Sequence, residues 1–301
     1  MENQDILIVG AGTAGLTAAI YVQRAGRHAI IFEKNAPGGQ IVTANEIENF
    51  PGFASVNGAD FAFKLYQQAT DLGAEYVSSE VIQILPEENK VTVKTKTKEY
   101  TGRALVYAAG AAHRKLGFAN EEKLIGKGIS FCANCDGAFY KGKVVAVNGG
   151  GNIALDDAAY LSKLASKVYL IHRRDQYRAE KVVQDRLIGL DNVEPLLSSV
   201  ITGLEEADGR LHGITVQNVN TKEEKDYQVD GLFEAIGMNP QTELLKGIVD
   251  LDPSGYILAG EDTRTNVPVI FAAGDVRLKQ VRQLTTAAAD GTTAAIQAVS
   301  L

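Results

Sequence analysis

Short, continuous apolar runs separated by helical patterns dominate this sequence. Such runs are typical of parallel strands that are buried on both faces of a sheet. They predict strands over residues 6–9, 29–32, 104–110, 143–147, 167–171, 232–237 and 269–276. Helices are predicted over 16–25 and 155–164, each between two of these strands. The alternation predicts an α/β fold built on parallel sheets.

Other segments have a different period. Residues 60–72 are amphipathic at helical spacing, which predicts a helix. Residues 91–98 alternate with a period of two and carry their lysines on one face, which predicts a strand with a solvated face. Residues 211–219 and 226–229 predict an antiparallel pair. Residues 37–52 are dense in turn formers and predict a loop, either a surface excursion or a lid.

The first glycine-rich turn is Gly10-Ala11-Gly12-Thr13-Ala14-Gly15, between a predicted strand and a predicted helix. Glycines allow a tight turn and let the backbone approach a pyrophosphate at the helix N-terminus. Glu33 ends the next strand, 21 residues after Gly12, where a carboxylate can hold ribose hydroxyls. This combination predicts a dinucleotide site, and a merely glycine-rich turn is the alternative.

A second glycine-rich turn follows a later strand: Gly149-Gly150-Gly151-Asn152-Ile153-Ala154. The strand end that corresponds to Glu33 here carries His172-Arg173-Arg174, with Arg178 one helical turn further on. Guanidinium groups at this place favour a 2′-phosphate, whereas a carboxylate favours a free 2′-hydroxyl. The second nucleotide is therefore predicted to be NADPH rather than NADH. The alternative is the basic start of an ordinary helix.

The two halves share one plan of nucleotide turn, charged strand end, small antiparallel layer and closing strand. The closing strands end at Gly110 and Gly237. This internal repeat predicts two dinucleotide-binding domains, each Rossmann-like with three layers.

The end of the chain is predicted to belong to the first dinucleotide-binding domain. Its last strand runs into Gly274-Asp275, where a carboxylate beside the first nucleotide could bind a ribityl hydroxyl. Residues 284–300 are rich in alanine and lack proline, which predicts a helix that begins after Gln283. Its N-terminal N–H groups could stabilise the negative charge of a reduced flavin. A plain packing helix is the alternative.

Cys132 and Cys135 are the only cysteines. Their spacing lets the two sulfurs cycle between a disulfide and a dithiol. A zinc site would need two more Cys or His ligands, and none of the four histidines lies within short motif spacing. We therefore expect redox chemistry and no metal, with an incidental pair as the alternative.

Composition and charge limit the classes of partner and the locations that we expect for this protein. The net charge of −7 argues against nucleic acid, whose binders carry a basic excess. No apolar run approaches the ~20 residues of a membrane helix. Residues 1–5 are polar and lead into a strand, which predicts that there is no export signal and that the location is cytoplasmic. In that reducing compartment a two-cysteine motif is more often catalytic than structural.

These motifs occur in the order and spacing of the low-molecular-weight thioredoxin reductases, and the chain resembles that family along essentially its whole length. The resemblance is carried by residues 10–15, 38–40, 48–52, 132–137, 149–154, 172–174, 178 and 272–276. It implies a homodimeric flavoprotein with an FAD domain over residues 1–113 and 244–301. An NADPH domain over 114–243, which carries the cysteine pair, would be inserted there and would rotate between two orientations.

Residue roles follow by position from the same resemblance. Cys135 resembles the sulfur nearer the flavin, Cys132 the thiol that attacks thioredoxin, and Asp136 the acid that manages the proton. Phe139 falls in the segment with which the family contacts thioredoxin. The implied FAD contacts are Gly10, Gly12, Thr13, Ala14, Gly15, Glu33, Gly39, Gln40, Asn49, Ala109, Gly110, Gly274, Asp275, Gln283 and Leu284. The implied NADPH contacts are Gly149, Gly151, Asn152, Ile153, Ala154, His172, Arg173, Arg174, Arg178, Ile236 and Gly237.

Four positions depart from the family pattern. Thr13 replaces a common proline, Asn134 replaces a threonine in the redox loop, and Ala138 replaces a bulkier residue. Ile153 stands where a serine or threonine is usual, at a helix start expected to face the NADPH phosphates. The lost hydrogen bond is worth ~1 kcal/mol, so we expect NADPH use to be weakened but not abolished.

The resulting hypothesis is an NADPH-dependent thioredoxin-disulfide reductase. Electrons would pass from NADPH to FAD, to the Cys132–Cys135 disulfide, and to thioredoxin or a thioredoxin-like protein. One alternative keeps the fold but takes electrons from ferredoxin, and another is an oxidase of small dithiols. Neither needs the arginines at 173, 174 and 178. A third alternative, a flavin-binding scaffold without turnover, has no use for a reactive thiol pair.

Overall fold

The computed structural model describes residues 5–44 and 46–301 and divides the chain into two compact units. Unit 1 comprises Met1–Ala112 and Asn239–Leu301, and unit 2 comprises His113–Met238. The expectation that residues 1–5 carry no export signal falls on residues 1–4, outside the described part, and residue 45 of the 37–52 segment is also outside it.

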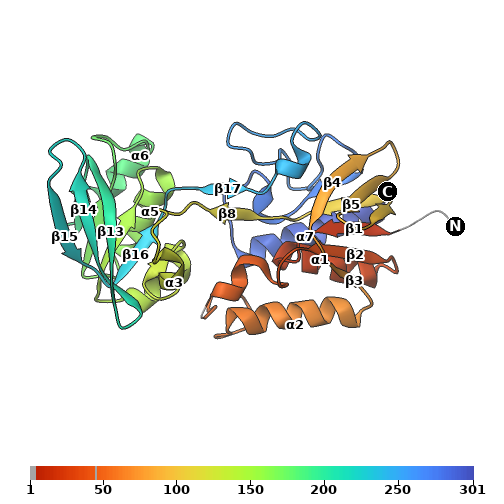
Figure 1. The fold of residues 1–301 in the computed structure, drawn as a ribbon, viewed down its shortest axis with the longest axis horizontal. Helices are drawn as coiled ribbons and strands as arrows, with labels where there is room; N and C mark the ends of the chain where they lie inside the picture. The colour runs from red at the N-terminus through yellow and green to blue at the C-terminus, as the bar shows by residue number, and fades with distance from the viewer. Residues whose placement is uncertain (1–4, 45) are drawn as a thin grey trace. The chain divides into compact units, whose positions relative to one another are not determined.

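Unit 1 is built on a parallel five-stranded sheet in the order β18-β7-β1-β2-β3 (Figure 1). Its strands are β1 (Ile6–Val9), β2 (Ala29–Glu33), β3 (Glu75–Ser78), β7 (Ala104–Tyr107) and β18 (Ile270–Ala272). The helices of this unit are α1 (Thr13–Arg24), α2 (Gly58–Asp71) and α7 (Leu284–Val299), with 3-10 turns η1 (Gly39–Thr43), η4 (Glu243–Leu245) and η5 (Gly274–Val276).

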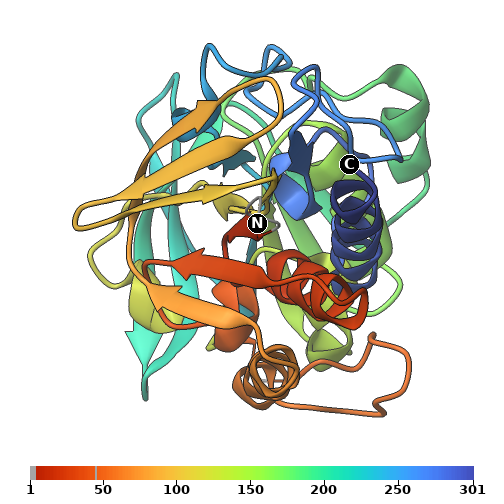
Figure 2. The same cartoon turned by 90° about the vertical axis from the view of Figure 1, so that its right-hand side faces the viewer.

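Side-chain alternation along β1 explains the three layers of unit 1. Ile6 and Ile8 pack against α1 and α7, which lie side by side (Figures 1 and 2). Leu7 and Val9 point to the other face, where they meet a small antiparallel sheet. Because successive strand residues face opposite sides, both faces need apolar residues and the run is continuous. The small sheet consists of β4 (Val81–Pro86), β5 (Val91–Thr95) and β6 (Glu99–Gly102).

Unit 2 repeats this architecture. Its parallel sheet has the order β12-β11-β10-β16-β9, with α5 (Asn152–Leu161) packed on one face and an antiparallel sheet on the other. The parallel strands are β9 (Ile129–Ser130), β10 (Val144–Asn148), β11 (Lys167–Ile171), β12 (Val193–Leu196) and β16 (Gly231–Glu234). The antiparallel strands are β13 (Ser199–Ala207), β14 (Arg210–Asn218) and β15 (Glu224–Gln228). Short helices are α3 (Glu121–Leu124), α4 (Ala133–Asp136) and α6 (Lys181–Gln184), with 3-10 turns η2 (Gly137–Tyr140) and η3 (Asp185–Leu187).

Two passages of the chain join the units. β8 (Ala111–His113) and β17 (Met238–Pro240) carry these passages and pair with each other as a two-stranded sheet. Unit 2 is therefore inserted between two parts of unit 1.

The predicted strands and helices are confirmed in type, whereas several predicted ends are wrong. The strand predicted over 91–98 ends at Thr95, because Thr95 Oγ1 accepts the N–H of Lys98 and closes a turn there. The strand predicted over 269–276 ends at Ala272, and Gly274 already begins η5. β13 was not predicted, because its polar residues interrupt the alternation of apolar and polar positions that is typical of a strand.

Candidate functional site

The first glycine-rich turn connects β1 to α1 in unit 1. Gly10 has φ +102°, and a Cβ there would lie 2.3 Å from the Ala108 oxygen. A Cβ on Gly15 would lie 1.9 Å from the Gly10 oxygen. Only glycine fits such close backbone contacts. At Gly12, the N-cap of α1, a Cβ would meet no atom within 4 Å. The helix therefore begins at an open place that suits a phosphate.

Glu33 lies where the sequence predicted it, at the end of β2 beside this turn. Its Oε2 accepts the Ala11 N–H at 3.0 Å, and its Oε1 accepts the Asn35 N–H at 2.9 Å. These two bonds orient the carboxylate and leave each oxygen a further lone pair. The geometry therefore suits the ribose contact that the spacing predicts.

The Pro-Gly-Gly-Gln loop joins the same turn. Gly38 donates its N–H to the Ala11 oxygen at 2.7 Å and forms a parallel bridge with Gly12. A Cβ on Gly39 would lie 3.4 Å from the Gly12 Cα. Gly38 belongs to the 38–40 segment that carries the family resemblance but was not among the implied FAD contacts. Its φ of +115°, and the Ala62 Cβ 2.4 Å from where its own Cβ would lie, leave room only for glycine.

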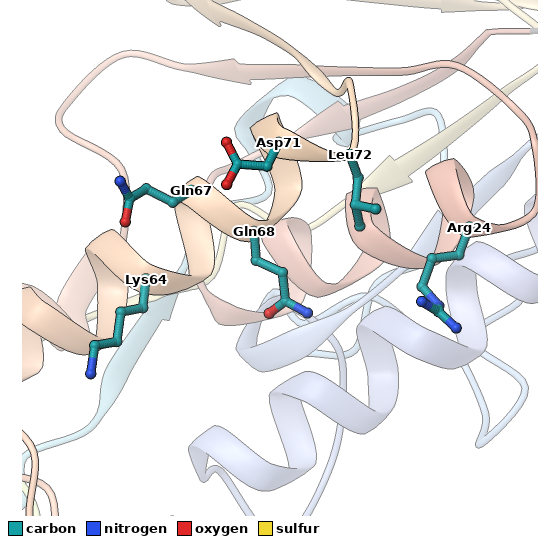
Figure 3. Close-up of a pocket in the computed structure, with 6 residues that line it drawn as sticks. All are labelled: Arg24, Lys64, Gln67, Gln68, Asp71 and Leu72. Atoms are coloured by element: carbon teal, nitrogen blue, oxygen red, sulfur yellow. The ribbon is translucent and has the colours of Figure 1, made fainter.

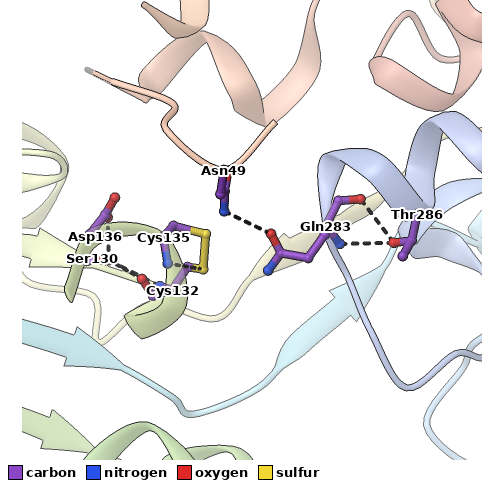
Figure 4. Close-up of a disulfide and its surroundings, with 7 residues drawn as sticks. All are labelled: Asn49, Ser130, Cys132, Cys135, Asp136, Gln283 and Thr286. Atoms are coloured by element: carbon purple, nitrogen blue, oxygen red, sulfur yellow. Dashed lines mark hydrogen bonds between the residues drawn. A yellow bond between two sulfur atoms is a disulfide. The ribbon is translucent and has the colours of Figure 1, made fainter. Parts of the chain in front are cut away.

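The other predicted contacts of unit 1 occupy neighbouring loops. Gln40 Nε2 donates to the Ala111 oxygen, just after Ala109 and Gly110. Asn49 Nδ2 donates to Gln283 Oε1 at 3.2 Å, which connects the residue 48–52 loop to the start of α7 (Figure 4).

Asp275 is the most informative residue of unit 1. Its Oδ1 is buried and has no hydrogen-bond partner among the residues that the structure describes. Burial raises the pKa of the Asp275 carboxyl, the cations Lys279 and Arg282 oppose this rise, and the Asp290 carboxylate adds to it. A buried polar atom without a partner is costly and rare, so its presence points to a ligand that would complete it. A sugar hydroxyl has the required donor.

Close packing brings these segments together. A Cβ on Gly274 would lie 3.0 Å from the Ala14 Cβ, and one on Gly291 of α7 would lie 2.2 Å from the Ala14 oxygen. Gln283 caps α7, and its backbone N–H donates to Thr286 Oγ1 at 3.1 Å (Figure 4). Leu284 is the first helical residue and is half-buried. Unit 1 thus combines an open helix start at Gly12, an oriented carboxylate and an unsatisfied acceptor, which together fit a dinucleotide.

The second glycine-rich turn lies between β10 and α5 in unit 2. A Cβ on Gly149 would lie 2.5 Å from the Ala235 oxygen, and one on Gly150 would lie 2.2 Å from His172 Nδ1. Gly151, the N-cap of α5, meets no atom within 4 Å. In both turns, therefore, a closely packed glycine is followed by an open glycine at the start of the helix.

The cationic segment lies beside this turn. Arg178 donates its backbone N–H to the Gly150 oxygen at 2.7 Å. The side chains at 173, 174 and 178 are exposed, and none of them has an ion pair among the residues that the structure describes. The expectation that Arg178 follows by one helical turn is wrong, because residues 172–180 are not helical and α6 begins only at Lys181. His172 is buried, and burial and the three arginines lower its pKa.

The start of α5 is only partly free. Asn152 exchanges two hydrogen bonds with Glu180, at 3.1 Å from its Nδ2 and 2.8 Å to its Oδ1. Ile153 is 65 % exposed, whereas the Ala154 side chain is fully buried. Ala154 can therefore offer a nucleotide only its backbone. Ile236 is half-buried and Gly237 is exposed, with φ +107°, at the end of the closing segment.

The cysteine pair forms a disulfide at the start of α4 in unit 2, with a Cα–Cα distance of 5.3 Å (Figure 4). The Cys135 N–H donates to Cys132 Sγ at 3.2 Å. Cys135 is exposed and Cys132 is half-buried. After reduction, the same N–H would donate to a thiolate on Cys132 and stabilise it.

Asp136 is held next to the pair. Ser130 Oγ donates to Asp136 Oδ2 at 2.6 Å and also accepts the Cys132 N–H at 3.1 Å (Figure 4). Burial raises the pKa of Asp136, and the Ser130 hydrogen bond partly opposes this. A carboxyl with a raised pKa beside a thiol pair can hold the proton that an exchange step releases. Ser130 was missed by the sequence analysis, because one serine two residues before a cysteine carries no signal.

Two further features lie outside the predicted residues. In unit 2, burial and the nearby Glu121 carboxyl raise the pKa of the buried Glu234 to about 8. On unit 1, a surface hollow is lined by Arg24, Lys64, Gln67, Gln68, Asp71 and Leu72 (Figure 3). No cluster of three or more His, Cys, Asp or Glu placed to hold a metal occurs in residues 5–44 and 46–301.

Comparison with known proteins agrees with this geometry. The family model described as pyridine nucleotide-disulphide oxidoreductase matches residues 4–291. The chain belongs to the pyridine nucleotide-disulphide oxidoreductase family. The family description names a disulphide, and this chain contains the Cys132–Cys135 disulfide.

Relatives within the pyridine nucleotide-disulphide oxidoreductase family carry more specific names. A thioredoxin reductase of Bacillus subtilis is 39 % identical over 97 % of this chain and 92 % of its own length. A thioredoxin reductase of Listeria monocytogenes is 41 % identical over 95 % of this chain and 90 % of its own length. The crystal structure of a thioredoxin reductase from Streptococcus pyogenes has a TM-score of 0.93 and 38 % identity, covering 99 % of this chain and 98 % of that one. The predicted fold class and the predicted family are confirmed.

Within the described ranges, 5–44 and 46–301, no helix is long and apolar enough to cross a membrane.

Proposed function

We propose that this oxidoreductase is an NADPH-dependent thioredoxin-disulfide reductase. The observation that carries the proposal is the Cys132–Cys135 disulfide, which lies with the half-buried Asp136 carboxyl in the unit that holds the second nucleotide turn. Relatives that share about 40 % of the sequence over nearly the whole chain are named thioredoxin reductases.

Two nucleotides complete the proposal. The open Gly12, the Glu33 carboxylate and the unpartnered Asp275 oxygen support FAD in unit 1. The open Gly151 and the exposed arginines at 173, 174 and 178 support NADPH in unit 2. When bound, FAD would relay the electron pair of NADPH to the disulfide.

The residues of the chain then carry out the exchange with the partner. The Cys132 thiolate attacks one sulfur of the thioredoxin disulfide, which forms a mixed disulfide and releases the other sulfur as a thiolate. Asp136 holds a proton next to this step and can protonate the leaving sulfur. Cys135 then attacks the mixed disulfide, which restores the Cys132–Cys135 bond and releases reduced thioredoxin. Phe139, which is 40 % exposed on this loop, would contact the partner.

The domain assignment belongs to the same proposal: an FAD domain over residues 1–113 and 244–301, and an NADPH domain over 114–243. It is supported by the FAD-type features of unit 1 and the arginine-bearing turn of unit 2. A homodimer and a cytoplasmic location are also proposed, in line with a reductase that keeps thiols reduced.

An anaerobic titration tests the function. NADPH should bleach the visible flavin absorption of the purified protein rapidly, NADH should do so much more slowly, and oxidised thioredoxin should restore the colour. No bleaching by either nucleotide would overturn the proposal and favour ferredoxin as the donor. Oxygen consumption driven by a small dithiol would favour the dithiol oxidase.

The disulfide route needs its own test. Cys135→Ser should still be bleached by NADPH but should not reduce thioredoxin, because one sulfur cannot store two electrons as a dithiol. Asn134→Ser is the matched control, since it changes an exposed neighbour and leaves both sulfurs. Native rates of thioredoxin reduction by Cys135→Ser would show that the electrons take another path.

A further inference from the structure

A buried charge cluster lies in unit 1, next to the Gly274-Asp275 turn. The Asp290 carboxylate on α7 is at its centre, with a side chain that is 7 % exposed. The Arg277 guanidinium bonds both carboxylate oxygens, at 2.9 Å from Nε and 2.7 Å from Nη2. Lys279 Nζ donates to Asp290 Oδ2 at 2.9 Å. The side chains of both cations are also buried, at 4 % and 6 % exposure.

The charges of this cluster involve Asp275. Two buried cations, Arg277 and Lys279, face one buried anion, Asp290, and Arg277 Nη2 also lies 3.6 Å from the exposed Glu261 carboxylate. Buried charges are tolerated when they are paired in this way. Burial raises the pKa of the neighbouring Asp275 carboxyl and Lys279 opposes this rise, so the cluster acts electrostatically on Asp275. Half-buried Arg282, which stacks 4.3 Å from the Tyr256 ring, adds a further cation near Asp275.

Asp290 also holds the backbone of the turn. The Gly274 N–H donates to Asp290 Oδ2 at 3.0 Å. Gly274 has φ +79°. Because glycine adopts positive and negative φ about equally readily, a contact such as this hydrogen bond is needed to hold it in one conformation. The next residue of α7, Gly291, packs directly on the Ala14 oxygen at the start of α1. One side chain thus fixes the turn that carries Asp275 relative to the two helices whose N-termini form the rest of the site.

We propose that Asp290 is a positioning residue for the flavin site, acting through its hydrogen bond to the Gly274 N–H and its ion pairs with Arg277 and Lys279. It touches no ligand itself. This inference rests on the proposed function, since it assumes that the Asp275 oxygen meets a hydroxyl of FAD. If residue 290 cannot accept the Gly274 N–H, the peptide group at Gly274 can rotate and move Asp275 away from the site. Part of the free energy of FAD binding is then used to return Asp275 to its position, so FAD binds more weakly.

A matched pair of triple variants isolates the Gly274 hydrogen bond from the charges. R277M/K279M/D290N removes the charge of Asp290 and the charges of its two cationic partners but keeps an amide oxygen that can accept the Gly274 N–H. R277M/K279M/D290L has the same shape and no acceptor. The measurement is the dissociation constant of FAD for apoprotein, from quenching of flavin fluorescence. Thermal unfolding of each apoprotein verifies that the variants fold.

The Asn variant should bind FAD within about threefold of the wild type, and the Leu variant about tenfold more weakly, because an unpaired buried N–H costs ~1–3 kcal/mol. Equal dissociation constants for the two variants, weak or tight, would overturn the proposal. If the Leu variant does not fold, R277M/K279M/D290A replaces it under the same criteria. Wild-type apoprotein that binds no FAD would instead overturn the proposed function.

Discussion

Replacing Ile153 with threonine should tighten NADPH binding. Ile153 is the second residue of α5, which begins after the open N-cap Gly151, and its side chain is 65 % exposed. Threonine at this position would offer a hydroxyl to a phosphate at the helix start, where the helix dipole already favours an anion. Isoleucine offers only methyl groups, so a phosphate oxygen facing it loses a donor.

The magnitude follows from one hydrogen bond. A net gain of ~1 kcal/mol corresponds to about a fivefold lower dissociation constant. The stability of the protein should barely change, because a surface substitution of this kind shifts the unfolding free energy by less than about 0.5 kcal/mol. The effect on binding is therefore separable from any effect on folding.

The assay is anaerobic stopped-flow bleaching of the flavin at increasing nucleotide concentration, which gives the dissociation constant. Ile153→Val is the matched control, because valine has the shape of threonine without the hydroxyl. NADPH and NADH should tighten by the same factor, since both carry the pyrophosphate. Equal affinities for the threonine and valine variants would refute the reasoning, and so would a gain confined to NADPH, which would place the hydroxyl at the 2′-phosphate.

Three other predictions concern charge. Arg174→Met should weaken NADPH binding at least tenfold and leave NADH unchanged, because a hydrogen bond to a charged group is worth ~1.5–3 kcal/mol; equal losses for both nucleotides would contradict it. Asp136→Asn should slow thiol exchange with thioredoxin roughly 100-fold and flatten its pH profile, since the protonated carboxyl acts only below its pKa, which burial raises; an unchanged profile would exclude the acid role. Lys279→Met removes a cation that lowers the pKa of Asp275, so this carboxylate should become protonated at a higher pH on acidification. The FAD dissociation constant should then begin to rise at a higher pH than in the wild type, and coinciding pH curves would refute this.

The sequence predicted the glycine-rich turns and the disulfide well because each is a pattern of neighbouring residues. A Cβ on Gly15 would collide with Gly10 in the same turn, whereas one on Gly10 or Gly149 would collide with the distant backbone of Ala108 or Ala235. The cysteines at 132 and 135 are three residues apart, and their spacing alone lets the sulfurs meet.

Strand ends were predicted less well. An apolar or alternating pattern continues as long as the side chains face a core, whereas a strand ends where its hydrogen-bonded neighbour ends. Residues 104–110 form one apolar run, but β7 stops at Tyr107, where its pairing with β1 and β18 also stops. The helical turn predicted between His172 and Arg178 was wrong for a related reason. The Arg178 N–H donates to the Gly150 oxygen of the glycine-rich turn and so does not form a helical hydrogen bond.

By itself, the sequence determined the α/β class, the two nucleotide turns and the redox pair, because short-range spacing and burial encode them. Only the tertiary structure decided which distant polar groups meet. Ser130 reaches Asp136 across the redox loop, and Asp290 reaches Gly274 from a different element. Glu234 acquires its raised pKa from burial and from Glu121, more than a hundred residues away in the chain. Such contacts depend on how layers pack, and no local pattern of residues records that.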